Sequence, residues 1–294
     1  MKNSKSLIIF ILFLFLNTIN NTQINLKELP IQDYNTLNQI FLGKTSTRTI
    51  IPLYENWTCY SENLSQQTKV NVPCSFSGAN IFYFVSYFNV SASQISNNSF
   101  FLNFLGINYY AEIEINDMLI FKTKGGEIPF KLKVPNEILK TNSNNKIKIK
   151  IHHNNNSQST IPFNKNFLFP ENLGGITRDI FLEVLPRIYF DEFKINFNLS
   201  KDNSSANLNI LFKINDLNNN VNFNGFTVDV TLLDKFKQEI KSYKGVGGNF
   251  SIDKKNSFNI ALENPALWSP ASPDYYYITL KLISSNQIID EVTQ

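Results

Sequence analysis

A period-two alternation of apolar and polar residues recurs along this chain and limits what it can fold into. In the segment 146–151 (KIKIKI), isoleucine alternates with lysine. Successive side chains of a strand point to opposite faces, so such a segment packs one face on a core and turns the other to water. The pattern returns in segments 128–134, 208–214, 226–232, 258–262 and 278–282. No segment has a helical period of useful length, and the pattern predicts an all-β protein of antiparallel strands.

The chain is long enough for a leader and two domains, each with its own core. We expect the boundary near Pro186, where the strand 180–185 closes the first unit and a new series of strands begins. Residues 28–186 are predicted to form a β-sandwich of the jelly-roll type, and 187–294 an immunoglobulin-like β-sandwich. Residues 23–49 are expected to lead into the first domain along its surface.

Composition excludes some classes of function. Hydrophobic residues make up 43% of the chain and charged residues 17%, which suits a globular protein better than a disordered one. The net charge is only +3, and the lysines are scattered along the predicted strands. There is therefore no basic patch that predicts a nucleic-acid partner.

The N-terminus has the pattern of a secretory signal peptide, which we assign to residues 1–22. Lys2 and Lys5 form a positive region, and the apolar run 7–16 (LIIFILFLFL) is too short to span a membrane. An uncleaved anchor is the alternative. We therefore expect an exported protein, whether extracellular, periplasmic or lysosomal, with no membrane span in the mature chain.

Export affects how the two cysteines are interpreted. Cys59 and Cys74 are the only cysteines, and an oxidising compartment favours a disulfide between them. Such a bridge closes a loop of about fifteen residues and contributes about 3 kcal/mol in the chain-entropy model. Two buried thiols are the alternative. The only histidines, His152 and His153, are adjacent and far from the cysteines, so we expect no metal site and no cofactor.

Two segments contain the turn chemistry on which the fold depends. Residues 109–122 predict a β-hairpin whose two-residue turn, Asn116–Asp117, can adopt positive φ. In the segment 174–179 (GGITRD), Gly174 and Gly175 precede Arg178 and Asp179 at the start of a strand. The arginine could be a buried structural clamp or a ligand clamp, and its chemistry favours the structural role.

Taken in order, these segments resemble the N-terminal part of glycoside hydrolase family 2, which includes β-galactosidases, β-glucuronidases and β-mannosidases. The resemblance covers about 235 residues. It rests on six motifs: NWTCY (56–60), VPCSF (72–76), GINYYAEIEIND (106–117), KGGEIPFKLKV (124–134), GGITRDIFLEVLP (174–186) and ENPALWSPASPDYY (263–276). It implies a galactose-binding-like jelly roll followed by an immunoglobulin-like domain.

The resemblance also implies that the chemistry lies elsewhere. In that family a (β/α)8 barrel follows these domains and supplies two glutamates, and retaining hydrolysis needs carboxyl groups about 5 Å apart. No residue here matches either glutamate, so we assign no catalytic residue. Glu112 and Glu114 lie two apart on one strand face. We interpret them as ordinary surface charges.

A weaker candidate for sugar contact is the loop before GGITRD, where the family's jelly roll reaches the sugar site. This loop offers aromatic, amide and acidic side chains, namely His152, His153, Asn164, Phe167 and Glu171. An ordinary solvated loop is the alternative. Trp268 could be a stacking platform, but its place between Pro265 and Pro270 favours a plug between the domains, with a partner for the indole N–H.

Three hypotheses follow. The chain is the non-catalytic portion of a family 2 glycosidase, whose catalytic barrel is absent from these residues and can be a separate polypeptide. Alternatively it is a free-standing secreted carbohydrate-binding protein, or a structural or adhesive β-sandwich protein. The first hypothesis predicts exposed apolar area near Trp268 and at the edge near Arg178, for a partner to cover.

Overall fold

The computed structural model describes residues 25–28, 45–62, 67–77, 79–124, 128–152, 174–247, 250–252 and 254–294. These residues form strands in five sheets, with one short α-helix and one 3-10 turn, which confirms the all-β prediction. The signal-peptide segment and the Gly125–Gly126 pair lie outside the described residues. No helix in the described part of the chain is long and apolar enough to cross a membrane.

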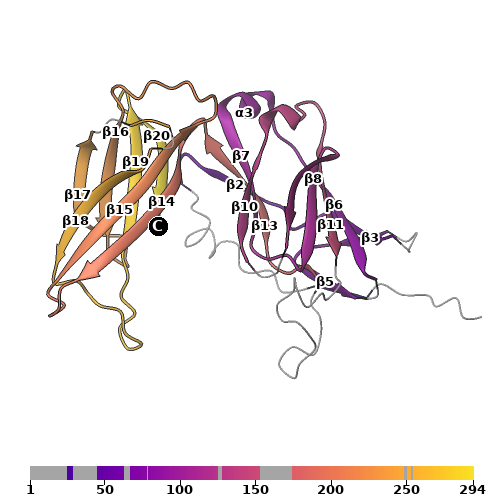
Figure 1. Ribbon diagram of the computed structural model, residues 1–294, viewed down its shortest axis with the longest axis horizontal. Coiled ribbons are helices and arrows are strands. Elements are labelled where there is room, and N and C mark those ends of the chain that lie inside the picture. The colour runs from indigo at the N-terminus through magenta and orange to yellow at the C-terminus, as the bar shows by residue number, and fades with distance from the viewer. Residues whose placement is uncertain are drawn as a thin grey trace, which may run out of the picture.

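The strands gather into two β-sandwiches that lie side by side (Figure 1). The first sandwich has a six-stranded sheet of order β4-β3-β6-β11-β8-β9. Its strands are β3 (Trp57–Ser61), β4 (Thr68–Val70), β6 (Ile81–Phe88), β8 (Tyr110–Ile115), β9 (Met118–Thr123) and β11 (Asn145–His152).

Two smaller sheets complete the first sandwich. A four-stranded sheet has the order β10-β7-β13-β2 and a three-stranded sheet the order β1-β5-β12. Their strands are β1 (Asn25–Glu28), β2 (Thr49–Pro52), β5 (Cys74–Ser77), β7 (Asn98–Phe104), β10 (Phe130–Val134), β12 (Gly174–Ile176) and β13 (Ile180–Pro186).

The alternating pattern of β11 shows how the first core is built. Ile147, Ile149 and Ile151 are fully buried, whereas the lysines between them face outward. The buried row packs in one cluster with Trp57, whose indole N–H donates to the carbonyl of Leu53 at 2.7 Å. One face of the six-stranded sheet is therefore core, and the other carries polar side chains.

The predicted hairpin is confirmed at its turn. Strands β8 and β9 pair through Asn116 and Asp117, which have φ of 50° and 66°. The Asn116 side chain also donates to the Ile138 carbonyl at 2.7 Å and so ties the hairpin to a neighbouring loop. Positive φ at both turn positions matches the right-handed twist of the strands.

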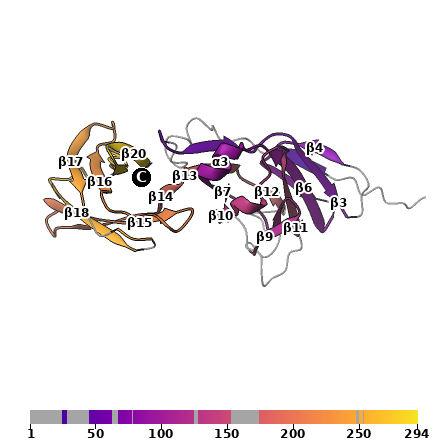
Figure 2. The same ribbon diagram turned by 90° about the horizontal axis from the view of Figure 1, so that it is seen from above.

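The second sandwich packs a three-stranded sheet, β14-β15-β18, on a four-stranded sheet, β17-β16-β19-β20. Figure 2 shows these sheets from above, separate from the first sandwich. The strands are β14 (Ile188–Leu199), β15 (Ser205–Asp216), β16 (Thr227–Leu233), β17 (Glu239–Val246), β18 (Asn256–Glu263), β19 (Tyr277–Ser284) and β20 (Gln287–Thr293).

A buried charged cluster joins the two sandwiches. Arg48 precedes β2 and donates to both carboxylate oxygens of Asp290 on β20, at 3.0 and 2.6 Å. It also donates to the carbonyl of Phe190 at 2.8 Å and lies 3.6 Å from the carboxylate of Glu183. Burial acts to lower the pKa of Arg48, but the hydrogen bond and charge of Asp290 outweigh it and raise that pKa. The guanidinium is therefore a permanent charge that bridges the domains.

The structure adds a short helix that the hydrophobic pattern did not predict. Helix α3 (Ala92–Asn97) begins with a capping box, in which the Ser91 hydroxyl accepts from the Gln94 N–H and the Gln94 side chain accepts from the Ser91 N–H. The helix has no buried residue, so it has no apolar period. Its local signal was the Ser-x-x-Gln spacing.

The expected disulfide is not formed. Cys59 and Cys74 are buried thiols, one on β3 of the six-stranded sheet and the other on β5 of the three-stranded sheet. Each fills a position in the core cluster of the first sandwich. Burial raises the pKa of Cys59 to about 12, so this thiol stays protonated at neutral pH.

We expect no alkylation of the native chain at pH 7.5, because both cysteines are buried and a buried thiol is a poor nucleophile. Denaturation without reductant should expose both cysteines and allow two additions. Intact mass after iodoacetamide treatment, in each condition, measures this directly. A denatured chain that gains no mass until reductant is added contains the disulfide and contradicts the structure.

Candidate functional site

One rim of the first sandwich brings together the two ends of the predicted sugar-contact loop. His152 ends β11 and lies opposite Tyr110, with the two rings edge to face at 4.9 Å. Gly175 on β12 forms a β-bridge with Asn108, with reciprocal backbone hydrogen bonds of 2.8 and 3.0 Å. The loop therefore leaves and returns at adjacent positions, next to the segment 108–110. This rim is the candidate site of the first sandwich.

Of the five residues predicted to contact sugar, the structure describes only His152. His152 lies at the rim, half-buried, and its Nε2 atom has no hydrogen-bond partner. Burial, and then the charge of Lys150, lowers the pKa of His152, so the imidazole is neutral at pH 7. His153, Asn164, Phe167 and Glu171 lie outside the described residues.

The GGITRD segment also contains a buried carboxylate, that of Asp179. Asp179 is only 3% exposed, and its Oδ2 atom has no hydrogen-bond partner. Its carbonyl accepts from the Leu105 N–H at 3.0 Å, while Thr177 and Arg178 both donate their N–H to the Gly106 carbonyl. Burial raises the pKa of the Asp179 carboxyl. A buried acid of this kind is a common feature of functional sites.

Arg178 does not have the buried position that a structural clamp requires. The residue is exposed, and its side-chain carbons lie against Gly106, where an added Cβ would be 3.0 Å from Cγ. The charge buried by this motif is that of Asp179. The expectation that Arg178 is buried is therefore wrong: the buried charged residue at the start of this strand is its neighbour, Asp179.

Asp179→Asn is expected to stabilise the chain at pH 7 by about 1 to 3 kcal/mol, since a buried carboxylate with one oxygen lacking a partner no longer has to be desolvated. With a raised pKa, the folded state holds the proton more tightly than the unfolded state. Stability from Asp179 is therefore present at acid pH and is lost as pH rises through the folded pKa. The gain from asparagine should shrink toward pH 4.

Urea denaturation of both proteins at pH 7 and pH 4 checks this expectation. Asp191→Asn, at an exposed aspartate on β14, is the matched control and should leave the midpoint unchanged at both values. A loss of stability at pH 7 in the Asp179 variant would mean that the carboxylate has a partner that holds it charged.

The outer face of the six-stranded sheet carries charges that pair with one another. Glu112 accepts from Lys122 at 2.9 Å and from the Tyr110 hydroxyl at 2.9 Å, and Glu114 lies 3.1 Å from Lys148. The hydrogen bond from Lys122 is the main cause that lowers the pKa of Glu112. The two glutamates are thus ion-paired surface groups, as predicted.

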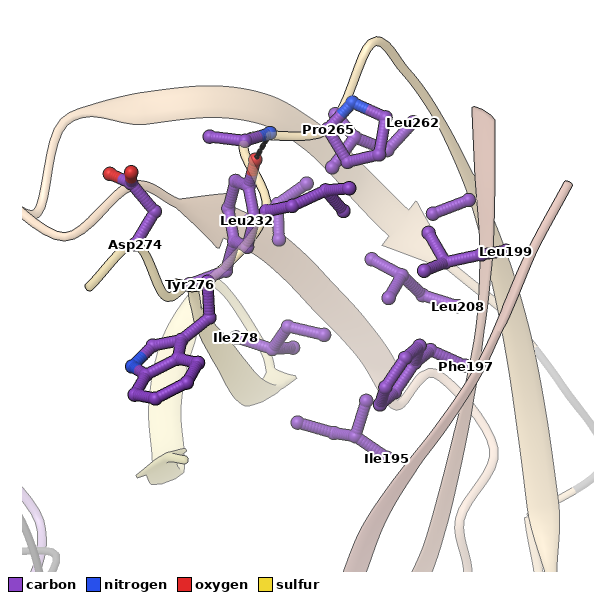
Figure 3. A pocket seen from close by; sticks show the side chains of 14 residues that line it. Ile195, Phe197, Leu199, Leu208, Leu232, Leu262, Pro265, Asp274, Tyr276 and Ile278 are labelled. Carbon is purple, nitrogen blue, oxygen red and sulfur yellow. Dashed lines mark hydrogen bonds between the residues drawn. The ribbon is translucent and has the colours of Figure 1, made fainter. Parts of the chain in front are cut away.

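A second candidate site is an apolar groove in the second sandwich (Figure 3). It has a volume of about 320 Å³ and lies between the inner face of β14 and the start of β19. Three side chains of β14, Ile195, Phe197 and Leu199, form one wall. Trp268, Tyr276 and Ile278 lie on the other side. We call this cavity the β14 groove.

Trp268 is not the plug between domains that the sequence suggested. It is 66% exposed and lines the β14 groove, which belongs to the second sandwich alone. The Tyr276 hydroxyl accepts from the Ala266 N–H at 2.6 Å and fixes the loop that presents the tryptophan. Exposed apolar area near Trp268 was expected and is confirmed. Arg48, Asp290 and Tyr189 join the domains instead, and Tyr189 packs edge to face on Phe101.

Within the described ranges, no three His, Cys, Asp or Glu side chains lie close enough together to hold a metal ion. The rim offers the His152 and Tyr110 rings, and the β14 groove offers Phe197, Trp268 and the Asp274 carboxylate. Such contacts can bind a ligand or a polypeptide, but they do not form a pair of reacting carboxyl groups.

Solved structures with this arrangement of sandwiches define the class of protein. The β-glucuronidase of Bifidobacterium dentium superposes with a TM-score of 0.69 at 17% identity, over 86% of this chain and 49% of that one. A β-D-glucuronidase of Dictyoglomus thermophilum gives 0.66 at 21% identity, over 86% and 44%. The fold is therefore the two-sandwich portion that these glycosidases contain.

Sequence comparison gives the family. The model of glycosyl hydrolases family 2 matches residues 188–294. A protein of Formosa agariphila assigned as a β-glucuronidase is 31% identical over 207 residues, and a β-galactosidase of Thermoanaerobacterium thermosulfurigenes is 23% identical over 262. The chain belongs to glycoside hydrolase family 2.

The matches cover much of this chain but little of its relatives. The aligned residues are 69% and 81% of this chain, and only 23% and 36% of the Formosa and Thermoanaerobacterium proteins. The chain thus spans about a quarter to a third of the length of these curated relatives.

Proposed function

We propose that these residues are the N-terminal, non-catalytic portion of a family 2 glycosidase. In this role they support the hydrolysis of O-glycosidic bonds in carbohydrate metabolism, while another part of the enzyme performs the reaction. The observation that carries the proposal is the coverage of the relatives, since this chain aligns with glycosidases over two sandwiches and leaves most of their length unmatched. The described acidic residues Glu112 and Glu114 are ion-paired with lysines on the outer face of the sheet.

The partners in this proposal follow from the same reasoning. The substrate is a carbohydrate, since the relatives are named as β-glucuronidases and β-galactosidases. The catalytic part is a barrel domain in the same polypeptide or a separate one. We further propose that the protein is exported, on the basis of the positive residues and the apolar run at positions 2–16.

A free-standing carbohydrate-binding protein is the second candidate, and the rim favours it. There the neutral imidazole of His152 and the ring of Tyr110 lie where the 153–173 loop begins, and Gly175, bridged to Asn108, lies close to where it ends. Aromatic faces and planar polar groups are the usual contacts for sugars. In this case the chain would bind sugar without any further domain.

A glycan array with the purified chain separates these two functions. A module that completes an enzyme site holds only part of the sugar contacts, so we expect no binding tighter than about 1 mM, near −4 kcal/mol. Binding at micromolar concentration or tighter, removed by His152→Ala together with Tyr110→Ala, would favour the free-standing binder. Lys69→Ala, at an exposed position on β4, is the matched control and should leave any binding unchanged.

A further inference from the structure

The β14 groove lies where the inner face of the second sandwich is uncovered. β14 is an edge strand of its sheet, and its inward row continues from Ile195 through Phe197 to Leu199. Phe197 is 65% exposed and Leu199 is 40% exposed. Side chains that point inward but remain exposed mark a place where the opposite sheet does not reach. A strand segment added on that side would bury them.

The opposite sheet borders this groove through β19, which pairs with β20. β20 is its edge strand, and Gln294 pairs with Ile278 of β19 through reciprocal hydrogen bonds of 3.0 and 2.9 Å. Ile278 itself lines the groove. The β19–β20 ladder pairs Leu280 with Val292 and Thr279 with Thr293. Its next pair, Ile278 with Gln294, lies at the edge of the groove.

The register of this ladder determines which residue could enter the groove. Each step forward along β20 is one step back along β19. The second residue after Gln294 would therefore lie opposite Tyr276, and the first opposite Tyr277. Directly opposite residues share a face of the sheet, and Tyr276 lines the groove. The side chain of that second residue would lie on the face of the sheet that lines the groove.

We propose that the β14 groove seats the extended segment that follows this position in the longer members of the family. The segment continues β20 by one further hydrogen-bonded pair and places an apolar side chain between Phe197 and Trp268. The proposal rests on family membership, since the relatives extend well beyond the length that this chain covers. It joins the second sandwich to the next domain by strand addition.

Two extended versions of the full chain test the register directly. One carries Thr-Leu-Thr after Gln294, which puts leucine opposite Tyr276 and into the groove. The matched version carries Leu-Thr-Thr, which has the same composition but puts leucine on the outer face. Trp57 is fully buried and Trp268 is exposed, so a change in tryptophan emission reports on the groove. Trp268→Phe confirms the source of the signal.

We expect Thr-Leu-Thr to shift the emission to shorter wavelength and to raise Tm by about 3 °C or more, because leucine buries apolar area at the groove. Leu-Thr-Thr should do neither. Phe197→Asp, at an exposed position, should abolish both effects of Thr-Leu-Thr. Equal behaviour of the two extensions, or no shift with either, overturns the proposal. A concentration-dependent dimer that Phe197→Asp abolishes would also overturn it, because a second copy would then fill the groove.

Discussion

Arg48→Met is expected to lower the free energy of unfolding by about 3 to 5 kcal/mol, since it leaves two carboxylates buried without their cation. Asp290 is fully buried and Glu183 nearly so. In the variant, the Asp290 carboxylate can still accept hydrogen bonds from the Phe190 N–H (2.8 Å) and from the Thr47 hydroxyl (3.0 Å). Neither donor carries a charge that would neutralise the carboxylate. Lys131, 2.5 Å from Glu183, compensates only that second carboxylate.

Urea denaturation followed by tryptophan emission measures the loss. Lys146→Met is the matched control, because Lys146 pairs with Asp117 at 2.8 Å on the surface and such pairs contribute about 0 to 1 kcal/mol. Replacing Asp290 by leucine in the Arg48→Met background removes one orphaned charge and should restore part of the loss. A loss in Arg48→Met no larger than in Lys146→Met would show that the cluster does not hold the sandwiches together.

Gly175→Ala is expected to destabilise the first sandwich by roughly 3 kcal/mol or more, from backbone strain and steric overlap together. Gly175 has φ of 133°, a region that residues with a side chain rarely adopt. An added Cβ would lie 2.4 Å from the carbonyl oxygen of Cys74 and 3.2 Å from the Cα of Ser75. Both are backbone atoms of the paired strand β5, so the clash cannot be relieved by a rotamer change.

Gly245→Ala is the control that separates the cost of backbone strain from the cost of steric overlap. Gly245 also has positive φ, 61°, but nothing lies within 4 Å of its added Cβ. The control should therefore cost only about 1 to 2 kcal/mol, the price of a left-handed residue with a side chain. Thermal unfolding of both variants makes the comparison. If the two alanines cost the same, the close approach of β12 to β5 is not a constraint on this rim.

Strands such as β11 were predictable because their burial follows the alternation of the sequence. In β11, isoleucine and lysine alternate from Lys146 to Ile151, and the isoleucines are the buried residues. The local sequence pattern therefore predicts which side chains enter the core. The hairpin at Asn116–Asp117 was predictable for a similar reason, since positive φ at a two-residue turn favours these residue types.

Contacts between distant residues had no such local signal. Arg48 and Asp290 are 242 positions apart, and each stands in a stretch where an isolated charge would be taken as exposed. Trp268 was misplaced because flanking prolines indicate a rigid loop but not the surface against which that loop packs. Arg178 was expected to be buried but is exposed, and the buried charged residue is its neighbour Asp179. The position of Arg178 depends on the contact with Gly106, 72 residues earlier, which no local pattern reveals.

The most direct test of this account is hydrolysis of 4-nitrophenyl β-D-glucuronide and β-D-galactoside by the purified 294-residue chain. The B. dentium β-glucuronidase serves as the positive control for the glucuronide, and the heat-treated chain as the blank. We predict no release of nitrophenol above the blank, because Glu112 and Glu114 are ion-paired on the outer face, and the buried Asp290 and Glu183 are both held by Arg48. Saturable turnover that copurifies with the chain would contradict the claim that these two sandwiches are the non-catalytic part of the enzyme.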